Sequence, residues 1–202
     1  MINQIREESI KKISNKYESE PEHALQVKKL ALIIFDKTKG MIHNMSDNEK
    51  DLLEAGAILH DIGYYICAKG HNKNSYNLIT QEDLQGFSML EKEIIGNIAR
   101  YHRGKLPKAK HSCYTELPDE AKSVVNKLGA FARLADGLDG SHCNVVDDLD
   151  FSYDTFTNEL LVILKLNTPD YTLEILKAED KKDFFEKIFN LKNRVNFQIH
   201  KI

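Results

Sequence analysis

A histidine–aspartate pair ends an apolar helical run in this sequence. His60 and Asp61 follow directly after Leu52–Leu59, where a packed core needs neither an imidazole nor a carboxylate. A buried carboxylate without a partner loses its solvation, and this loss costs free energy. Imidazole nitrogens and carboxylate oxygens are, however, ordinary ligands of divalent transition metals. The pair therefore indicates metal binding.

Further residues of the same two kinds occupy comparable positions. His23, His102 and Asp136 each continue the apolar stripe of an expected helix, so that each side chain points inward. One histidine of this kind would be explained as a core residue bonded to a backbone carbonyl. Several together favour side chains from different helices that meet at one metal site, as in helical bundles.

The ligand types limit the metal. Histidine and aspartate without a thiolate suit Mn, Fe, Co, Ni or Zn, with Mg as a further candidate, rather than a structural zinc. We expect one or two ions, because Asp61 has two oxygens and can bridge them. Two ions about 3.5–4 Å apart can clamp a phosphoryl group. The expected metal ligands are His23, His60, Asp61 and Asp136 for the first ion, and His71 and His102 with Asp61 for the second.

Basic side chains accompany these residues. Guanidinium groups bind phosphate oxygens with two parallel hydrogen bonds, and lysine acts as a point charge. We expect Arg103 and Arg133 to contact phosphate or to pair with Asp61 or Asp136. Lys73 is either a phosphate contact or a solvated lysine. The catalytic candidates are therefore Asp61, Arg103, Arg133 and Lys73.

Other polar residues have plainer expectations. Asp139 either orients a metal ligand or is a helix-end carboxylate without a role. Surface positions are expected for His43, His111, His142 and His200, which lie in polar or terminal contexts. Helix ends and turns are expected at Gly63, Gly70 and Gly86.

The first part of the chain has helical periodicity. Pro21 suits a first turn, and the helix that it opens should stop at Gly40. Capping boxes at 46–49 and 88–91 open two further helices, and 119–138 is expected to form another.

After about Asn144 the pattern alternates as in strands. We expect strands over 149–153 and 159–166 with a hairpin turn between them, a helix over 171–190 and an edge strand over 195–199. The expected fold is mainly α. It comprises a helical bundle over residues 1–144 and a small C-terminal α+β appendage over 145–202, with antiparallel strands plus one helix.

Composition is that of a globular protein. Apolar residues make up 42% and charged residues 29% of the 202 positions, and the net charge is −3. We find no basic tract for nucleic acid, no apolar run of roughly 20 residues and no signal peptide at 1–8. Three separated cysteines suit a reducing compartment. We therefore expect a cytoplasmic protein without a nucleic-acid or membrane partner, and the apolar helix 171–190 could support a homodimer.

The order His23, His60–Asp61, Asp136 resembles the signature of the HD-domain metal-dependent phosphohydrolases. Longer blocks resemble the carboxy-terminal HD module of the exopolyphosphatase/guanosine pentaphosphate phosphohydrolase family. These blocks are 60–63, 70–79, 84–88, 98–104 and 128–139. The resemblance covers nearly the whole chain, and it implies helices followed by a few strands and a helix.

Departures from the family matter for function. We expect the family's amino-terminal actin-like domains, and with them their phosphatase site, to be absent. The complete ligand set, which full-length members often lack, argues instead for metal chemistry in this module. Ile62–Gly63 is not followed by the acidic pair of the alarmone hydrolases, so that pair is not carried over.

The leading hypothesis is a metal-dependent phosphohydrolase in which a metal-bound hydroxide attacks a phosphate ester or anhydride. Its partner would be a phosphorylated small molecule, with a nucleotide among the candidates. One alternative is a di-iron HD-type oxygenase with the same ligands. Another is a non-enzymatic, nucleotide-sensing or regulatory HD module.

Overall fold

The computed structural model describes residues 2–17, 20–191 and 194–200. The helices are α1 (Gln4–Lys16), α2 (Pro21–Thr38), α3 (Asp47–Ile58), the 3₁₀ helix η1 (Ile62–Tyr65), α4 (His71–Gln81), α5 (Met89–Tyr101), α6 (Ser112–Thr115), α7 (Asp119–Leu138) and α8 (Thr172–Ile188). The strands are β1 (Val146–Asp154), β2 (Glu159–Leu166) and β3 (Val195–Ile199). The fold is mainly α with a small sheet, as expected.

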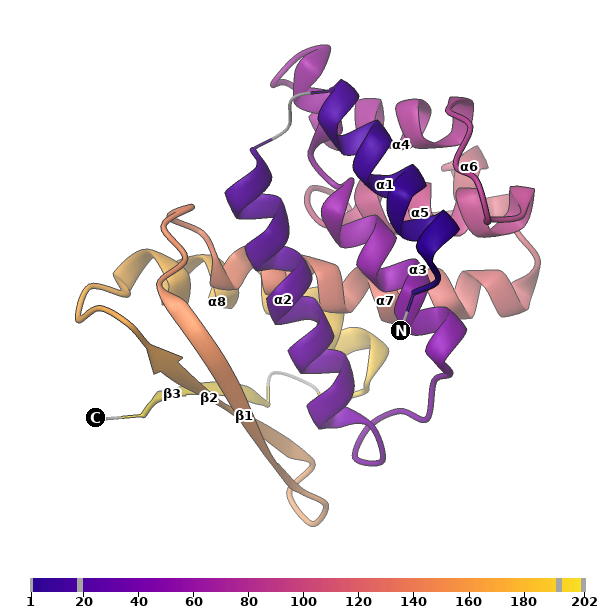
Figure 1. Cartoon of the computed structure of the whole chain (residues 1–202). Coiled ribbons are helices and arrows are strands. Elements are labelled where there is room, and N and C mark those ends of the chain that lie inside the picture. Colours follow the sequence, from indigo (N-terminus) through magenta and orange to yellow (C-terminus); the bar gives the residue numbers. More distant parts are fainter. Residues whose placement is uncertain (1, 18–19, 192–193, 201–202) are drawn as a thin grey trace.

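The helix α7 is the centre of the bundle. It packs against α2, α3, α5 and α8, and Figure 1 shows it crossing behind α2 and α3. Every residue from Leu128 to Leu138 is buried, because helices cover this half of α7 on several sides. Side chains that point out of this part of α7 therefore meet other helices rather than water.

The predicted helix starts are confirmed. Ser46 and Ser88 each form a complete capping box with the glutamate three residues later, and Pro21 is the first residue of α2. Gly70 and Gly86 have φ of 79° and 80°, a backbone conformation that favours glycine, so the turns expected there are also confirmed.

The sheet has the order β1-β2-β3. The predicted hairpin is confirmed, since β1 and β2 pair antiparallel with Asp154 opposite Glu159. The edge strand is confirmed too, but β3 runs parallel to β2, so the expectation of antiparallel strands was wrong for this pair. The reason is the connection, because α8 lies between β2 and β3 and carries the chain back to the end where β2 began.

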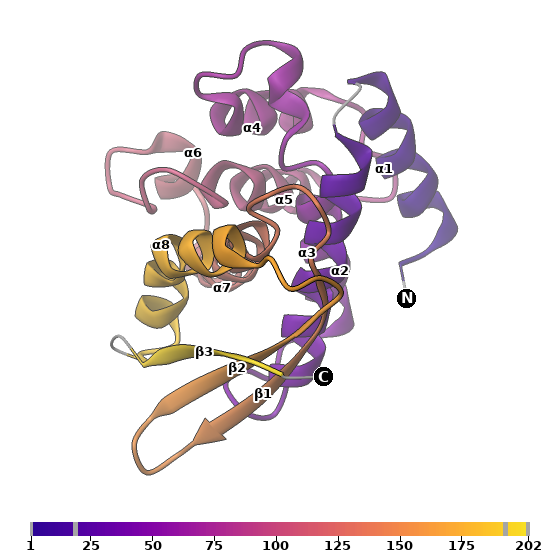
Figure 2. The ribbon, with the colours of Figure 1, turned by 90° about the vertical axis from the view of Figure 1, so that its left-hand side faces the viewer.

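Figure 2 shows α8 alongside α7, with the strands below both helices in that view. The buried core is continuous from the bundle into the strands, since Phe131, Leu149 and Val162 belong to one apolar cluster. The change from helices to strands falls at Val146, and the division into 1–144 and 145–202 stays a prediction. Within the described residues, no helix is long and apolar enough to cross a membrane.

Candidate metal centre

Three histidines are fixed in the same way by the backbone before them. The Nδ1 atoms of His60, His71 and His102 lie 2.7, 3.0 and 2.6 Å from the carbonyl oxygens three residues earlier. A carbonyl oxygen only accepts, so each Nδ1 carries the hydrogen and each Nε2 of the neutral ring presents a lone pair. All three rings are buried. Their orientation as ligands is therefore set before any metal binds.

A glycine brings two of these elements together. His60 and Asp61 lie in the turn between α3 and η1, and His71 begins α4. A Cβ atom on Gly63 would lie 2.0 Å from the His71 carbonyl oxygen and 2.4 Å from the backbone nitrogen of Ser75. Gly63 also donates its N–H to Ser75 Oγ over 2.9 Å. It lies within η1 and serves close packing, so the expectation of a simple helix end was wrong.

His23, in the first turn of α2, is held by the end of α7. Its Nδ1 lies 2.7 Å from Oδ2 of Asp139, which is fully buried. Its ring stacks on His142, with 3.7 Å between the ring centroids and 2° between the planes. Asp139 therefore orients His23, which is one of the two roles that the sequence left open for it.

Asp61 lies between two groups of imidazoles. Its Oδ2 is 3.2 Å from Nε2 of His60 and 3.9 Å from Nε2 of His23. Its Oδ1 is 3.1 Å from Nε2 of His71 and 3.5 Å from Nε2 of His102. The ligand atoms thus form two groups that share Asp61, namely His23, His60, Asp61 and Asp61, His71, His102.

Asp136 lies at the edge of both groups. Its Oδ1 is 3.3 Å from Nε2 of His23, and its Oδ2 is 4.0 Å from Nε2 of His102. Oδ2 also accepts a hydrogen bond from Nζ of Lys181 on α8. All six ligands expected from the sequence therefore lie together, although Asp136 shares its carboxylate with a lysine.

The metal-ligand atoms of this cluster are arranged as a bound cation would require. Among the described residues, Nε2 of His23, Nε2 of His60 and Oδ1 of Asp61 are buried without a hydrogen-bond partner. The Nε2 atoms of His71 and His102 are 3.4 Å apart, and with both Nδ1 hydrogens used, neither neutral ring can donate to the other. Converging lone pairs and an ionised carboxylate are costly unless a positive charge lies between them.

The titration behaviour of these groups agrees with this geometry. Burial lowers the pKa of His102 to about 3, so the ring is neutral at neutral pH. Burial opposes ionisation of Asp61 and Asp136, but His60 beside the first and Lys181 beside the second outweigh it and lower both pKa values. Both carboxylates are therefore ionised and available as ligands.

His23 and His60 behave differently from His102. Asp136 and Asp139 outweigh burial and raise the pKa of His23 to about 9. Asp61 likewise outweighs burial and raises the pKa of His60. Without metal, a proton on Nε2 of His23 therefore occupies the place where a cation would bind.

A cavity of about 380 Å³ opens onto the cluster. Asp61, His71, His102 and Asp136 form its floor. Its walls include Tyr64, Arg103, Arg133, His142, Lys177, Asp180 and Lys181. Four of these wall residues are cationic and one is acidic, so positive charge that can attract an anion lies next to the ligand cluster. The four are Arg103, Arg133, Lys177 and Lys181.

The predicted basic residues have different positions. Arg103 lines the cavity, with Nη1 3.5 Å from Nε2 of His71. Arg133 lines it too, where it pairs with Asp183 over 3.2 Å and donates to the Gly104 carbonyl over 3.1 Å rather than to Asp61 or Asp136. Of its two expected roles, the phosphate contact stays a prediction. Lys73 does not line this cavity and instead lines a neighbouring one.

Sequence reasoning missed several wall residues. Lys177 and Lys181 lie one turn apart on α8, and nothing in their local pattern distinguishes them from other lysines of a charged helix. His142 is exposed, so the expected surface position is confirmed, but its ring also stacks on His23. His43 is buried, with Nε2 2.8 Å from the Phe35 carbonyl oxygen, so the surface expectation was wrong there. It packs in the core because a backbone carbonyl satisfies it.

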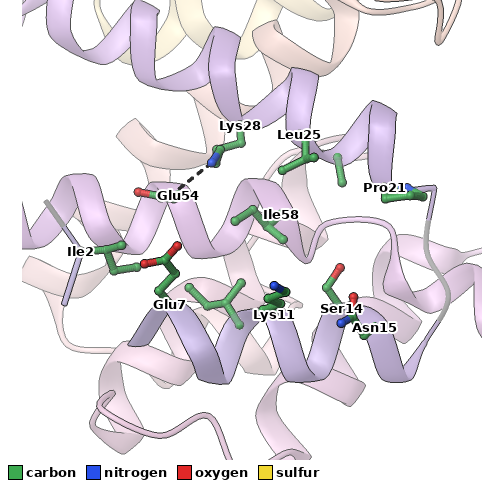
Figure 3. Close-up of a pocket in the computed structure, with 12 residues that line it drawn as sticks. Ile2, Glu7, Lys11, Ser14, Asn15, Pro21, Leu25, Lys28, Glu54 and Ile58 are labelled. Carbon is green, nitrogen blue, oxygen red and sulfur yellow. Dashed lines mark ion pairs between the residues drawn. The ribbon is translucent and has the colours of Figure 1, made fainter. Parts of the chain in front are cut away.

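Another hollow lies away from the cluster. Figure 3 shows it between α1, α2 and α3, with Lys28 and Glu54 paired across it at 3.6 Å. Its lining mixes apolar residues such as Leu25 and Ile58 with solvated charges and contains none of the six expected ligands. It therefore has no part in the metal site.

Comparison with known proteins identifies the family. The family model described as Ppx/GppA phosphatase, domain III, matches residues 5–174. The chain belongs to this family. The matched region contains all six clustered residues, together with Arg103 and Arg133, and it ends before Lys177 and Lys181.

Relatives within the Ppx/GppA family carry a nucleotide-related name. A guanosine-5'-triphosphate,3'-diphosphate pyrophosphatase of Vibrio campbellii is 32% identical over 118 residues, which are 58% of this chain and 22% of that protein. Proteins of the same name from Vibrio vulnificus and Vibrio parahaemolyticus are 31% and 33% identical over 57% and 52% of this chain, and 22% and 21% of theirs. The match thus spans about a fifth of the length of these relatives.

Proposed function

We propose that this chain is a metal-dependent phosphohydrolase with an HD-type centre, acting on a phosphate ester or anhydride. The division of the ligand atoms into two groups that share Asp61 is the observation that carries the proposal. The residues that would hold the metal are His23, His60, Asp61, His71, His102 and Asp136. When bound, one or two divalent ions would supply Lewis-acid charge and bring the pKa of a water toward neutrality.

The chain's own residues would do the rest. Backbone carbonyls and Asp139 hold the imidazoles in place, so little reorganisation is needed when substrate arrives. Arg103 and Lys181 line the cavity over the ligand cluster, where they can bind phosphoryl oxygens and offset charge that develops during transfer. Arg133 is held by Asp183 and the Gly104 carbonyl, so it presents a fixed positive charge.

A phosphorylated nucleotide is our first candidate substrate. The support is the name of the Vibrio relatives, which refers to a guanosine nucleotide with phosphates at two positions. Because the match spans only about a fifth of those proteins, their activity and substrate are carried to this chain only as a proposal.

The cavity walls favour a hydrolase over the alternatives. A di-iron oxygenase can use the same ligands, but it has no need for four basic side chains above the metals. A regulatory module needs the basic walls but not two sets of preoriented lone pairs. The combination of both features in one cavity is what phosphoryl transfer requires.

The test is metal content and turnover measured together. Protein purified without chelator should contain a transition metal by elemental analysis. With added Mn or Co it should hydrolyse a generic phosphodiester or a nucleotide. Asp61→Ala should lose metal and activity, and His60→Ala should lose activity and at least the ion near His23. His200→Ala, which changes an exposed histidine, should retain both metal and activity.

Three outcomes would contradict the proposal. Absence of bound metal together with no turnover would remove the enzyme assignment. Turnover that requires oxygen and iron would favour the oxygenase. Normal phenotypes of cells that carry only the His60→Ala and Asp61→Ala forms would favour a regulatory module.

A further inference from the structure

A second cavity lies beside the one over the metal cluster. It also encloses about 380 Å³, and it lies between the start of α4 and the segment that follows α5. Its lining residues are Asn72, Lys73, Arg100, Tyr101, Gly104, Lys105, Lys110 and His111.

This lining carries positive charge without a counter-charge. It contains Lys73, Arg100, Lys105 and Lys110 and no carboxylate. Within residues 2–17, 20–191 and 194–200, none of these four cations has a carboxylate oxygen within ion-pair distance, although such pairs are frequent elsewhere in the chain. Burial, followed by repulsion from Arg100 and Lys110, lowers the pKa of His111, which agrees with a positive potential in this cavity.

Arg100 gives the cavity a fixed cation. It is half-buried, and its Cζ lies 5.8 Å from the ring centroid of Tyr76 and 5.9 Å from that of Tyr101. The carboxylate of Glu93 accepts from the Tyr76 hydroxyl over 2.7 Å and forms no ion pair with Arg100. The Arg100 guanidinium also hydrogen-bonds the Tyr101 side chain. Because no carboxylate pairs with it, its other N–H groups remain for a ligand.

The two cavities meet at Gly104, which lines both. Its carbonyl accepts from Arg133 of the metal-side cavity over 3.1 Å. Arg103 lines the metal-side cavity and Lys105 the second one, so a three-residue segment presents cations to both. Asn72 fixes this region by donating to the Arg100 carbonyl over 2.7 Å.

We propose that the second cavity is a binding site for a phosphoryl dianion. Its four cations without a carboxylate suit a compact oxyanion. Tyr101, which lines the cavity, is buried and offers no face on which a base could stack. The dianion is either free phosphate or a second phosphoryl group of the molecule whose first group lies over the metals. Only this second source rests on the proposed function.

The test measures binding without catalysis. Titration calorimetry with inorganic pyrophosphate is done on metal-free His60→Ala protein, so that the metal-side cavity cannot hold the anion through a metal. Arg100→Gln, and the double change Lys73→Gln with Lys110→Gln, should each weaken binding about tenfold or more, because charge-assisted hydrogen bonds are lost. Lys12→Gln, the same change on exposed α1, should leave it unaltered.

The outcomes separate this site from the proposed function. Equal pyrophosphate affinity in all variants, with thermal unfolding showing that each is folded, would overturn the site even if hydrolysis were established. Tighter binding of a short single-stranded oligonucleotide than of pyrophosphate would also overturn it, in favour of nucleic acid. If the site is intact, introducing Arg100→Gln into the otherwise wild-type enzyme identifies the source of the anion. A KM that rises for a nucleoside diphosphate but not for a phosphate monoester identifies a second phosphoryl group of the substrate. An equal effect on the KM of both substrates identifies free phosphate.

Discussion

Asp61 and His71 face each other with 3.1 Å between Oδ1 and Nε2, while the other oxygen of Asp61 faces His60. Neither atom of the first pair can satisfy the other when His71 is neutral, because both present lone pairs. A carboxylate placed between two sets of imidazoles in this way is suited to bridging two cations. The histidines of the two groups lie on different elements, so each group can be tested separately by changing its own histidines.

His71→Ala should remove one metal and leave the other. The variant deletes a ligand from the group of Asp61, His71 and His102, and His23 and His60 remain untouched. Elemental analysis should show the metal content falling from two ions per chain to one, with activity lost because the second ion no longer holds the phosphoryl group.

His60→Ala provides the comparison from the other group. It should affect the ion near His23 first, and the remaining ion should depend on His71 and His102. Full metal content in His71→Ala protein would remove His71 from the ligand set.

The metal-free protein should become less stable as pH rises from about 6.5 to about 9. The folded pKa of His23 is raised to about 9 from 6.5, so its contribution is fully present below 6.5 and is lost as pH rises through 9. Because a pKa unit corresponds to about 1.36 kcal/mol, the contribution is at most about 3 kcal/mol. Denaturant unfolding in the presence of chelator at pH 6 and pH 9 measures it.

Metal should reverse this dependence. Binding requires His23 to lose its Nε2 proton, so metal affinity should rise with pH up to about 9 and binding should release a proton. In the metal-free state, the free energy of unfolding of the His23→Gln variant should differ less between pH 6 and pH 9 than that of the unchanged protein. An unchanged difference would show that other groups cause the pH dependence.

Lys181→Met should destabilise the metal-free protein and strengthen metal binding. Lys181 donates to Asp136, and without it the buried carboxylate loses the neighbour that contributes most to lowering its pKa, while His23 remains at 3.3 Å. Removing one partner of such a pair costs about 3–5 kcal/mol, and a bound ion would restore the charge balance. KM for a phosphorylated substrate should rise, because a cation of the cavity wall is lost.

Lys187→Met is the matched control, since it changes an exposed lysine on the same helix. It should leave thermal stability, metal affinity and KM as they are in the unchanged protein. If Lys181→Met weakened metal binding instead, Lys181 would act by holding Asp136 in place rather than by opposing the ion.

The ligand cluster could be predicted because metal ligands interrupt a regular pattern. His60, His102 and Asp136 occupy positions where helical periodicity predicts apolar residues. Each of them contacts another expected ligand in the observed cluster. Capping boxes likewise located α3 and α5 to within a residue. In each case a local pattern and a tertiary contact agree.

Arg103 and Arg133 of the cavity wall were named from the sequence, but the α8 part of the wall could not be predicted, because it depends on how α8 docks on α7. Lys177 and Lys181 look like solvated lysines in the sequence, and only the docking places them over the cluster. The direction of β3 was missed for a related reason. Alternating residues identify a strand but carry no information about whether its neighbour runs parallel or antiparallel.

Gly63→Ala should destabilise the protein and impair the His71 group more than the His60 group. The new Cβ would lie 2.0 Å from the His71 carbonyl oxygen, so α4 must move away from η1 and carry His71 with it. Forced overpacking of this kind costs typically about 1–3 kcal/mol. Thermal unfolding measures the loss, and elemental analysis should show the second ion depleted before the first.

Gly40→Asn tests whether any glycine change would do the same, since a Cβ there meets nothing within 4 Å and asparagine tolerates its positive φ. Comparable losses in both variants would mean that the close approach of α4 to η1 does not determine the position of His71.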